Sequence, residues 1–190
     1  MKRRAVLASG ATVALAGCLS LLEPEESLEA HETTHTGNRA LEFCNQDETI
    51  GRMTFVPVSA TPQLPKFDLF PNAVGEPSLE RFEVTFTFEE LDERGGTMEV
   101  FLVSGPDLGS VDIDSGPLSS SFQFDFSGSS PRPSRFGAIP YVDDADELEE
   151  VAMTIEVLMT IRESGFRDTV YTGDGTMQAE FTGDPIPLWE

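Results

Sequence analysis

From Val151 to Ile161, every second residue is large and apolar. Successive side chains of a β-strand point to opposite faces of a sheet, so a period of two places these apolar side chains on one face. A pattern of this kind is typical of an antiparallel strand that turns one face to the core and the other to solvent. The segment therefore predicts a half-buried strand. Its apolar positions are Val151, Met153, Ile155, Val157, Met159 and Ile161.

The same alternation recurs elsewhere in the chain. It is found in residues 82–88, 97–103 and 122–126, and phenylalanine supplies many of the apolar positions. Two shorter segments, Met53–Val58 and Ser110–Asp114, have enough β-branched and apolar residues to add further strands. These segments predict a sheet whose core is filled mainly by phenylalanine.

The last part of the chain predicts a hairpin. Residues 167–172 and 176–182 flank Gly173-Asp174-Gly175, and an Asp-Gly step between two strand segments is a hairpin signal. With these two the sequence contains about eight short strands and no long amphipathic helix. We therefore expect an all-β fold in which two antiparallel sheets stack as a β-sandwich, immunoglobulin-like or related to it. A closed β-barrel is the alternative.

Two segments between the strands are expected to be irregular. Val58–Pro77 contains four prolines, which lack the backbone N–H that a sheet needs, so a long surface connection or a segment packed over the core is expected there. Ser127–Pro140 is rich in serine and proline and predicts a loop. The acidic run Asp143–Glu150 follows and is expected to begin a short helix.

Acidic residues greatly outnumber basic ones. The chain has 34 Asp and Glu against 12 Lys and Arg, a formal net charge of -22. At molar salt the screening length shrinks to about 3 Å, so the self-repulsion of such a chain largely disappears. Because only Lys2 and Lys66 are lysines, the composition resembles that of proteins from halophilic archaea. The same charge disfavours nucleic acid as a partner, since a polyphosphate would meet a surface of its own sign.

The amino terminus carries two sorting motifs. Arg3 and Arg4 precede a mild apolar stretch that is too short to span a membrane, and Leu15-Ala16-Gly17-Cys18 follows it. The pair of motifs resembles the twin-arginine signal and the lipobox of haloarchaeal lipoproteins. That resemblance implies export through Arg3 and Arg4, cleavage in the lipobox formed by Leu15, Ala16 and Gly17, and lipid attachment to Cys18. The expected location is the exterior face of the cell membrane.

The sequence divides into three expected parts. Residues 1–17 form the signal peptide, residues 18–40 the lipidated cysteine with an acidic tether, and residues 41–190 a single β domain. The tether is expected because Leu19–Asn38 is polar and has no sustained apolar stripe. Within it, a short helical turn is expected around Leu28–Thr34.

One motif in the expected tether suggests metal chemistry. His31-Glu32-Thr33-Thr34-His35 matches the HExxH pattern and resembles the zincin metallopeptidases. The resemblance implies that His31 and His35 bind zinc and that Glu32 activates water. A zincin also takes a third ligand from a later helix, and the sequence has only these two histidines. Zinc binding by His31 and His35, with or without peptidase activity, is therefore the alternative to a chance match in a solvated tether.

The remaining residues favour a binding or structural role. The absence of histidine after His35 removes a Ser-His-Asp or Cys-His centre from the β domain. With Cys18 lipidated, Cys44 is the one remaining thiol and is expected to pack as a small hydrophobe beside Phe43. We therefore expect a module of the cell envelope rather than an enzyme, with no catalytic residue and no cofactor. Its partners would be the membrane, through the lipid, and an envelope protein or small ligand.

Overall fold

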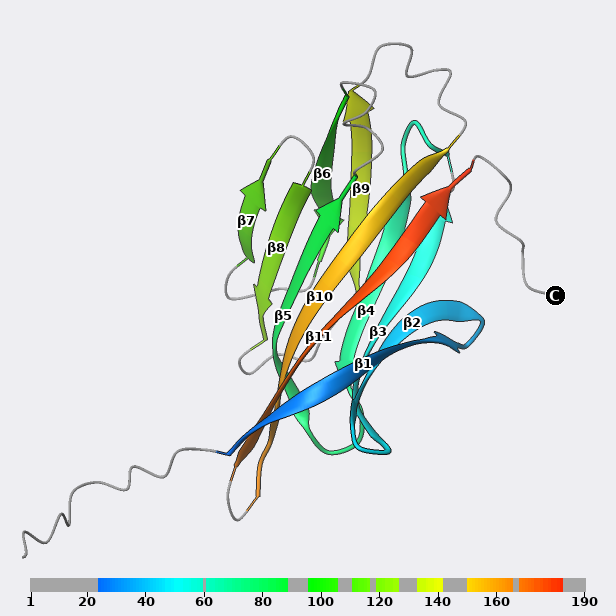
Figure 1. Cartoon of the computed structure of the whole chain (residues 1–190). Helices are drawn as coiled ribbons and strands as arrows, with labels where there is room; N and C mark the ends of the chain where they lie inside the picture. Colours follow the sequence, from blue (N-terminus) through cyan, green and yellow to red (C-terminus); the bar gives the residue numbers. More distant parts are fainter. Residues whose placement is uncertain are drawn as a thin grey trace, which may run out of the picture.

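A computed structural model of the chain describes residues 24–59, 61–88, 96–105, 111–116, 119–126, 133–141, 150–165 and 168–182. The sorting motifs of residues 1–18 and the acidic residues 143–149 lie outside these ranges. The described residues form eleven strands and no helix (Figure 1), so none of them provides a helix that could span a bilayer. The strands are β1 (Glu25–His35), β2 (Asn38–Asn45), β3 (Glu48–Ser59), β4 (Lys66–Ala73), β5 (Ser78–Thr87), β6 (Thr97–Ser104), β7 (Val111–Ser115), β8 (Ser119–Asp125), β9 (Ser134–Tyr141), β10 (Val151–Glu163) and β11 (Thr169–Phe181).

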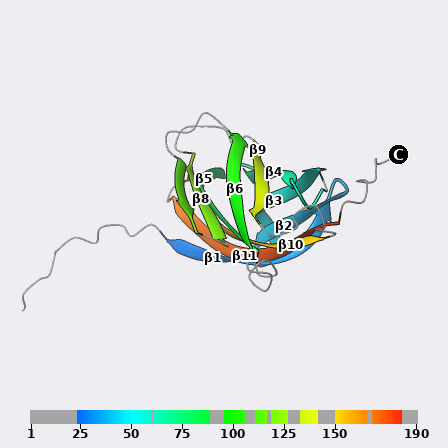
Figure 2. The same ribbon diagram turned by 90° about the horizontal axis from the view of Figure 1, so that it is seen from above.

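The strands are hydrogen-bonded in the order β6-β9-β4-β3-β2-β1-β11-β10-β5-β8-β7. We call β6-β9-β4-β3-β2 leaf 1 and β11-β10-β5-β8-β7 leaf 2. Figure 2 shows the strands curving around a shared interior, and in the hydrogen-bonding order β1 lies between the two leaves. The all-β fold and the expected sandwich are confirmed. The described strands do not close into a barrel, because β6 and β7 remain at the two ends of the order.

Strand β1 joins the leaves by changing partners half-way along. Residues 25–28 pair in parallel with residues 170–173 of β11, and residues 29–35 pair antiparallel with β2. The crossing needs glycine on β11. A Cβ on Gly175 would lie 2.6 Å from the Cβ of Ala30, and one on Gly173 would lie 2.8 Å from the Cβ of Leu28. The two glycines therefore let β1 approach β11 closely.

The prediction of an acidic tether reaching to residue 40 is wrong, and so is the helical turn around Leu28–Thr34. Residues 25–35 form β1 and residues 38–45 form β2. Only Leu28 of β1 is fully buried, at 6% exposure, so the strand carries almost no apolar stripe to reveal it in the sequence. Backbone pairing with strands on both sides holds it instead.

The predicted hairpin at Gly173-Asp174-Gly175 is also wrong. Strand β11 runs unbroken from Thr169 to Phe181 and pairs with β10 along its whole length. The chain reverses between Glu163 and Thr169 instead. The glycines that suggested a turn are the ones that β1 packs against.

The proline-rich segments contain strands that the sequence did not predict. Pro71 lies in β4 and Pro140 in β9. Strand β4 pairs with β9 only through residues 66–69, matched to residues 134–137, so each proline lies where its strand has a partner on one side only. A third, Pro57, is next to a register shift between β3 and β4. Edge positions and bulges tolerate a missing N–H.

Phenylalanine fills the core as expected. Phe67 of β4 is fully buried and lies at the centre of a group of rings, with centroid distances of 5.5 Å to Phe55, 5.2 Å to Phe86, 5.6 Å to Phe136 and 6.1 Å to Phe181. These rings come from both leaves. The cluster therefore ties leaf 1 to leaf 2 across the sandwich.

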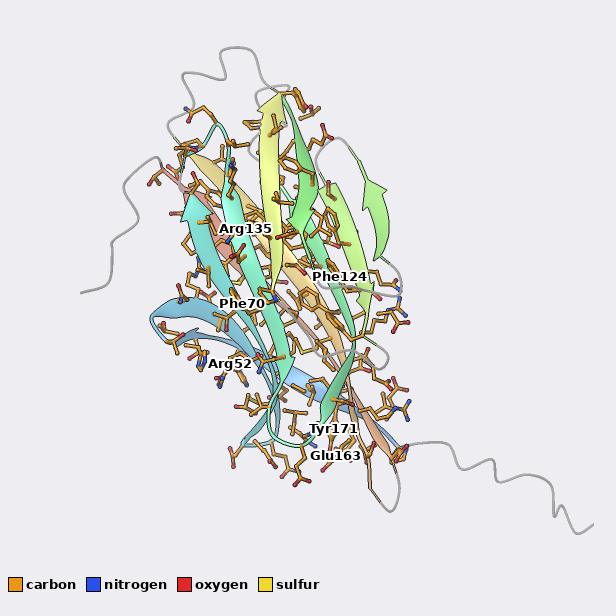
Figure 3. All side chains as sticks on the ribbon, turned by 180° about the vertical axis from the view of Figure 1, so that it is seen from behind. Arg52, Phe70, Phe124, Arg135, Glu163 and Tyr171 are labelled. Carbon is orange, nitrogen blue, oxygen red and sulfur yellow. The ribbon has the colours of Figure 1, made fainter. Side chains whose placement is uncertain are left out.

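Tyr171 lies at the end of the sandwich where β1 begins, beside Glu163 (Figure 3). Its side chain is buried, and its hydroxyl donates a hydrogen bond to Glu163 Oε2 at 2.9 Å. Burial raises the pKa of Tyr171 to about 12, and the hydrogen bond to Glu163 and the charges of Glu163, Glu26 and Glu48 act in the same direction. The folded protein therefore favours the neutral phenol.

This tyrosine should make the protein sensitive to alkali. A free tyrosine has a pKa of about 10, so the stabilisation by Tyr171 is complete below pH 10 and is lost as the pH rises towards 12. Denaturant unfolding in molar salt between pH 8 and pH 12 should show this loss in the wild type and a flatter profile in Tyr171→Phe. Tyr141→Phe is the comparison: the hydrogen bond to Glu99 also raises the pKa of this tyrosine, but its exposed position lets solvent screen the effect, so its removal should flatten the profile less. Identical profiles for the wild type and Tyr171→Phe would contradict the assignment.

Candidate functional site

The outward faces of the two leaves differ in character. The exposed large hydrophobic side chains of the described residues all lie on leaf 1 or on its β3–β4 connection. Leaf 2 instead has a hollow of about 420 Å³ whose lining includes Glu83, Glu156 and Asp174. Solvent-exposed apolar side chains are found at interaction sites more often than an acidic, hydrated face is. The exposed residues of leaf 1 are Val58, Leu64, Phe70, Val103 and Tyr141.

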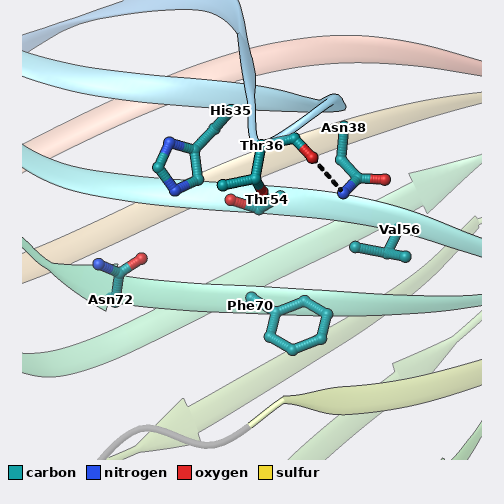
Figure 4. A pocket seen from close by; sticks show the side chains of 7 residues that line it. All are labelled: His35, Thr36, Asn38, Thr54, Val56, Phe70 and Asn72. Carbon is teal, nitrogen blue, oxygen red and sulfur yellow. Dashed lines mark hydrogen bonds between the residues drawn. The ribbon is translucent and has the colours of Figure 1, made fainter. Parts of the chain in front are cut away.

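A groove lies on leaf 1 where the β1–β2 hairpin meets the outer face of β3 and β4 (Figure 4). Its volume is about 330 Å³, within the range of small-molecule sites. The hairpin supplies one wall, and β3 and β4 supply the floor and the other wall. The lining residues are His35, Thr36 and Asn38 from the hairpin, Thr54 and Val56 from β3, and Phe70 and Asn72 from β4.

The wall depends on an unusual turn. Thr36 and Gly37 connect β1 to β2 with φ angles of 49° and 82°. Two left-handed residues in succession are typical of the tight turn that matches the twist of a β-hairpin. Glycine adopts this conformation freely, but a β-branched threonine does so at a cost. The turn therefore keeps a hydroxyl-bearing side chain in the groove at a position where asparagine would suit the backbone better.

The described residues that line the groove include no carboxylate, although the chain has a net charge of -22. The ring of Phe70 is 37% exposed, while Thr54 on the neighbouring strand is only 7% exposed. Thr54 and Phe70 are directly paired, so the ring and the threonine lie side by side. No described residue forms a hydrogen bond with the hydroxyl of Thr54, and its oxygen is not among the buried unsatisfied atoms of these residues, so it faces the groove. A ligand in the groove could supply one.

The charges around the groove are neutralised in pairs. Arg52 donates to Glu42 Oε1 at 2.6 Å, and its other terminal nitrogen lies 3.4 Å from His35 Nε2. Arg135 holds Asp68 with two hydrogen bonds of 2.7 and 2.8 Å on the same outer face of leaf 1 (Figure 3). A two-point arginine–carboxylate contact of this kind fixes both side chains. Both arginines are therefore already committed to a carboxylate.

The structure does not bring the two histidines of the HExxH motif to one metal ion. Both lie on β1, which is a strand and not a helix. Residues four apart on a strand are separated by about 13 Å, whereas one helical turn would bring them together. His31 is exposed and lies 4.0 Å from Glu29, while His35 lines the groove. Glu32 pairs with Arg39 at 2.8 Å. The zincin geometry implied by the resemblance is therefore absent from β1.

Other potential ligands do not restore a metal site in the described ranges, where no three His, Cys, Asp or Glu side chains form a suitable group. Cys44 is a free, half-buried cysteine on β2, with its Sγ 3.7 Å from Thr49 Oγ1. It is thus less buried than its neighbour Phe43, which is fully enclosed.

Most of the groove residues were not identified from the sequence. Thr54 falls in a segment whose composition predicts a strand, but Phe70 and Asn72 fall in the proline-rich segment, for which the sequence predicts a surface connection or a segment packed over the core. Their outward orientation follows from the alternation of β4, where Leu69 and Pro71 are buried and Phe70 is exposed. No signal in the sequence sets the register that places β4 beside β3.

The chain matches no known protein-family model and no curated protein sequence. Several solved structures are similar to it. They include the collagen-binding subdomain of the Enterococcus faecalis surface protein ACE, at 7% identity and a TM-score of 0.39, covering 72% of this chain and 98% of that one. A non-cellulosomal cohesin from Archaeoglobus fulgidus has 8% identity and a TM-score of 0.36, covering 64% and 89%. A collagen-binding domain from a Staphylococcus aureus adhesin has 8% identity and a TM-score of 0.32, covering 68% and 97%. Likeness at this level concerns the fold alone.

Proposed function

We propose that the protein is a lipid-anchored binding module of the cell envelope and that the outer face of leaf 1 is its binding surface. One observation carries this function: the exposed apolar side chains and the uncharged groove of the described residues share leaf 1, while leaf 2 presents acids and threonines. In a chain of this net charge, an acidic and hydrated surface is the default. Leaf 1 departs from that default over several strands.

The fold is compatible with attachment through Cys18. Strand β1 begins at Glu25, so the link from the cysteine spans at most about 24 Å when fully extended. That link would hold the Tyr171 end of the sandwich close to the bilayer. His35 and the groove lie at the other end of β1, roughly 34 Å farther along the strand. A lipid on Cys18 would therefore leave the groove directed away from the membrane surface.

Two sets of variants test the proposal. In the first, wild-type protein should sediment with membranes, and Cys18→Ser should move it to the soluble fraction. In the second, the Cys18→Ser protein is mixed with isolated envelopes of the host at molar salt. Adding Phe70→Ser and Val103→Ser should lower its retention at least about tenfold, because truncation of a central apolar contact costs more than 1 kcal/mol.

The matched control changes an outward apolar residue of leaf 2, Leu158→Ser, which should leave retention unchanged. If the leaf 1 variant is retained as well as its parent, leaf 1 is not the binding surface. The same conclusion follows if Leu158→Ser lowers retention equally. Circular dichroism of each variant establishes that its fold is intact.

A further inference from the structure

We infer that the groove of leaf 1 binds an uncharged sugar ring of a glycan. This inference rests on the proposed function and names its ligand. It follows from four properties of the groove: its lack of unpaired charge, its exposed aromatic ring, its unsatisfied neutral polar atoms, and the absence of a free strand edge at its floor.

The first property excludes strongly ionic ligands. None of the described residues that line the groove is a carboxylate, an arginine or a lysine. Two cations on the same face, Arg52 and Arg135, are held by Glu42 and Asp68. A phosphate, a sulfate or a uronate would have to displace one of these carboxylates and leave it unpaired. A ligand without net charge avoids that cost.

The second property supplies an apolar platform. Phe70 is 37% exposed on the outer face of β4, and Val56 lies in the same groove (Figure 4). The C–H groups of a sugar ring form an apolar patch that can pack on the negative face of an aromatic ring. A single ring with small residues around it suits one sugar residue at a time. The extended aromatic surface that would take a long chain is not present in this groove.

The third property supplies hydrogen bonds to hydroxyl groups. Asn38 and Asn72 each donate only to a backbone carbonyl, at 3.5 Å to Thr36 and 3.2 Å to Ala73, which leaves both amide oxygens without a partner in the described residues. A carboxamide can donate and accept at once, which matches the hydroxyl of a sugar.

The hydroxyl of Thr54 points to the same ligand. Thr54 is only 7% exposed, and no described residue forms a hydrogen bond with its hydroxyl. The oxygen of this hydroxyl is not among the buried unsatisfied atoms of the described residues, so it is open to the groove and can exchange a hydrogen bond with a ligand hydroxyl. The threonine forms the floor of the groove between the hairpin and Phe70.

The fourth property disfavours an extended peptide. Peptides that add to a sheet bind through the backbone of a free edge strand. The floor strand β3 is paired with β2 on one side and with β4 on the other. Where β4 extends beyond its pairing with β9, it carries Pro71, which has no N–H to donate. Recognition in the groove therefore depends on side chains.

Saturation-transfer NMR on the purified lipoprotein tests this inference directly. The protein is kept at molar salt in a detergent without a sugar headgroup. The probes are the methyl glycosides of glucose, galactose, mannose and N-acetylglucosamine, with glucuronate as the charged counterpart and an unstructured synthetic peptide as the alternative occupant. At least one neutral glycoside should bind at about 10 mM or below, and glucuronate and the peptide should bind more weakly.

Variants then locate the binding. Phe70→Ala should weaken the affinity at least about tenfold, and Thr54→Val about five- to tenfold, because it keeps the shape but removes the hydroxyl. Thr54→Ser should restore binding. Thr154→Val on leaf 2 should leave the affinity unchanged.

The possible failures are distinguishable. If no neutral glycoside binds, or if binding ignores both Phe70→Ala and Thr54→Val, the sugar inference is wrong. Stronger binding of glucuronate or of the peptide would also overturn it. If the variant with Phe70→Ser and Val103→Ser still loses envelope retention in those cases, the proposed function stands without the sugar inference. If glycosides bind in the groove but this variant is retained as well as its parent, the proposed function is wrong instead.

Discussion

Phe67→Ala should lower the free energy of unfolding by about 4 kcal/mol, the largest effect that we expect of a single substitution in this fold. The side chain is fully buried and packs against four other rings from both leaves. Removing it costs the transfer of the ring from water and leaves a cavity that the rigid neighbouring rings cannot fill. Denaturant unfolding at molar salt measures the change.

Phe70→Ala on the same strand is the matched control. It removes the same side chain from the opposite face of β4, where the ring is partly exposed. Its expected cost is below about 1 kcal/mol, since surface substitutions rarely exceed that. Equal losses for the two variants would show that the alternation of β4 between core and outer face is not as described.

Gly175→Ala should destabilise the protein by about 2 to 3 kcal/mol although it adds only one methyl group. The new Cβ would lie 2.6 Å from the Cβ of Ala30. Because a Cβ is fixed to the backbone, β1 must shift away from β11 to relieve the contact, and this weakens the pairing that joins the two leaves. Thermal or denaturant unfolding should report the loss, and protease cleavage within β1 should become faster.

Gly116→Ala serves as the control for the loss of glycine itself. A Cβ at Gly116 would meet nothing nearer than a carbonyl oxygen at 3.5 Å, an ordinary contact. This variant should change stability by less than about 1 kcal/mol. If Gly175→Ala is as mild as Gly116→Ala, β1 does not cross β11 at the described distance.

The strands that the sequence predicted well are those with a continuous apolar face. Strand β10 is the clearest, because all six of its alternating apolar residues are buried. Strands β5 and β8 likewise have one buried face of mainly phenylalanine. In these strands the local period and the tertiary environment agree, so a short window of sequence is sufficient.

The strands that the sequence missed are stabilised by their neighbours. Strand β1 is mostly polar, and β4 and β9 carry prolines that are tolerated because each strand has a partner on only one side there. Gly173-Asp174-Gly175 has the composition of a turn but meets a different requirement, the close approach of β1. None of these features depends on residues nearby in sequence, so local patterns could not identify them.

The candidate site was hidden for the same reason. Phe70, Thr54 and His35 are distant in sequence, and only the pairing of β2, β3 and β4 places them around one groove. The HExxH motif brings its two histidines to one zinc ion only when the segment is helical, and here the backbone of the segment is extended. The spacing of two histidines is therefore informative only together with the secondary structure.

The two histidines provide the most direct test of the proposal that the protein lies at the cell surface with a ligand in the leaf 1 groove. They are the only histidines of the chain, they lie on one strand, and only His35 lines the groove. Diethyl pyrocarbonate, which modifies accessible imidazoles, is applied to intact cells and to the purified protein, and mass spectrometry gives the ratio of modified His35 to modified His31. Occupation predicts a ratio that is several-fold lower on cells than on the purified protein. Equal ratios in the two samples would contradict a binding role for the groove.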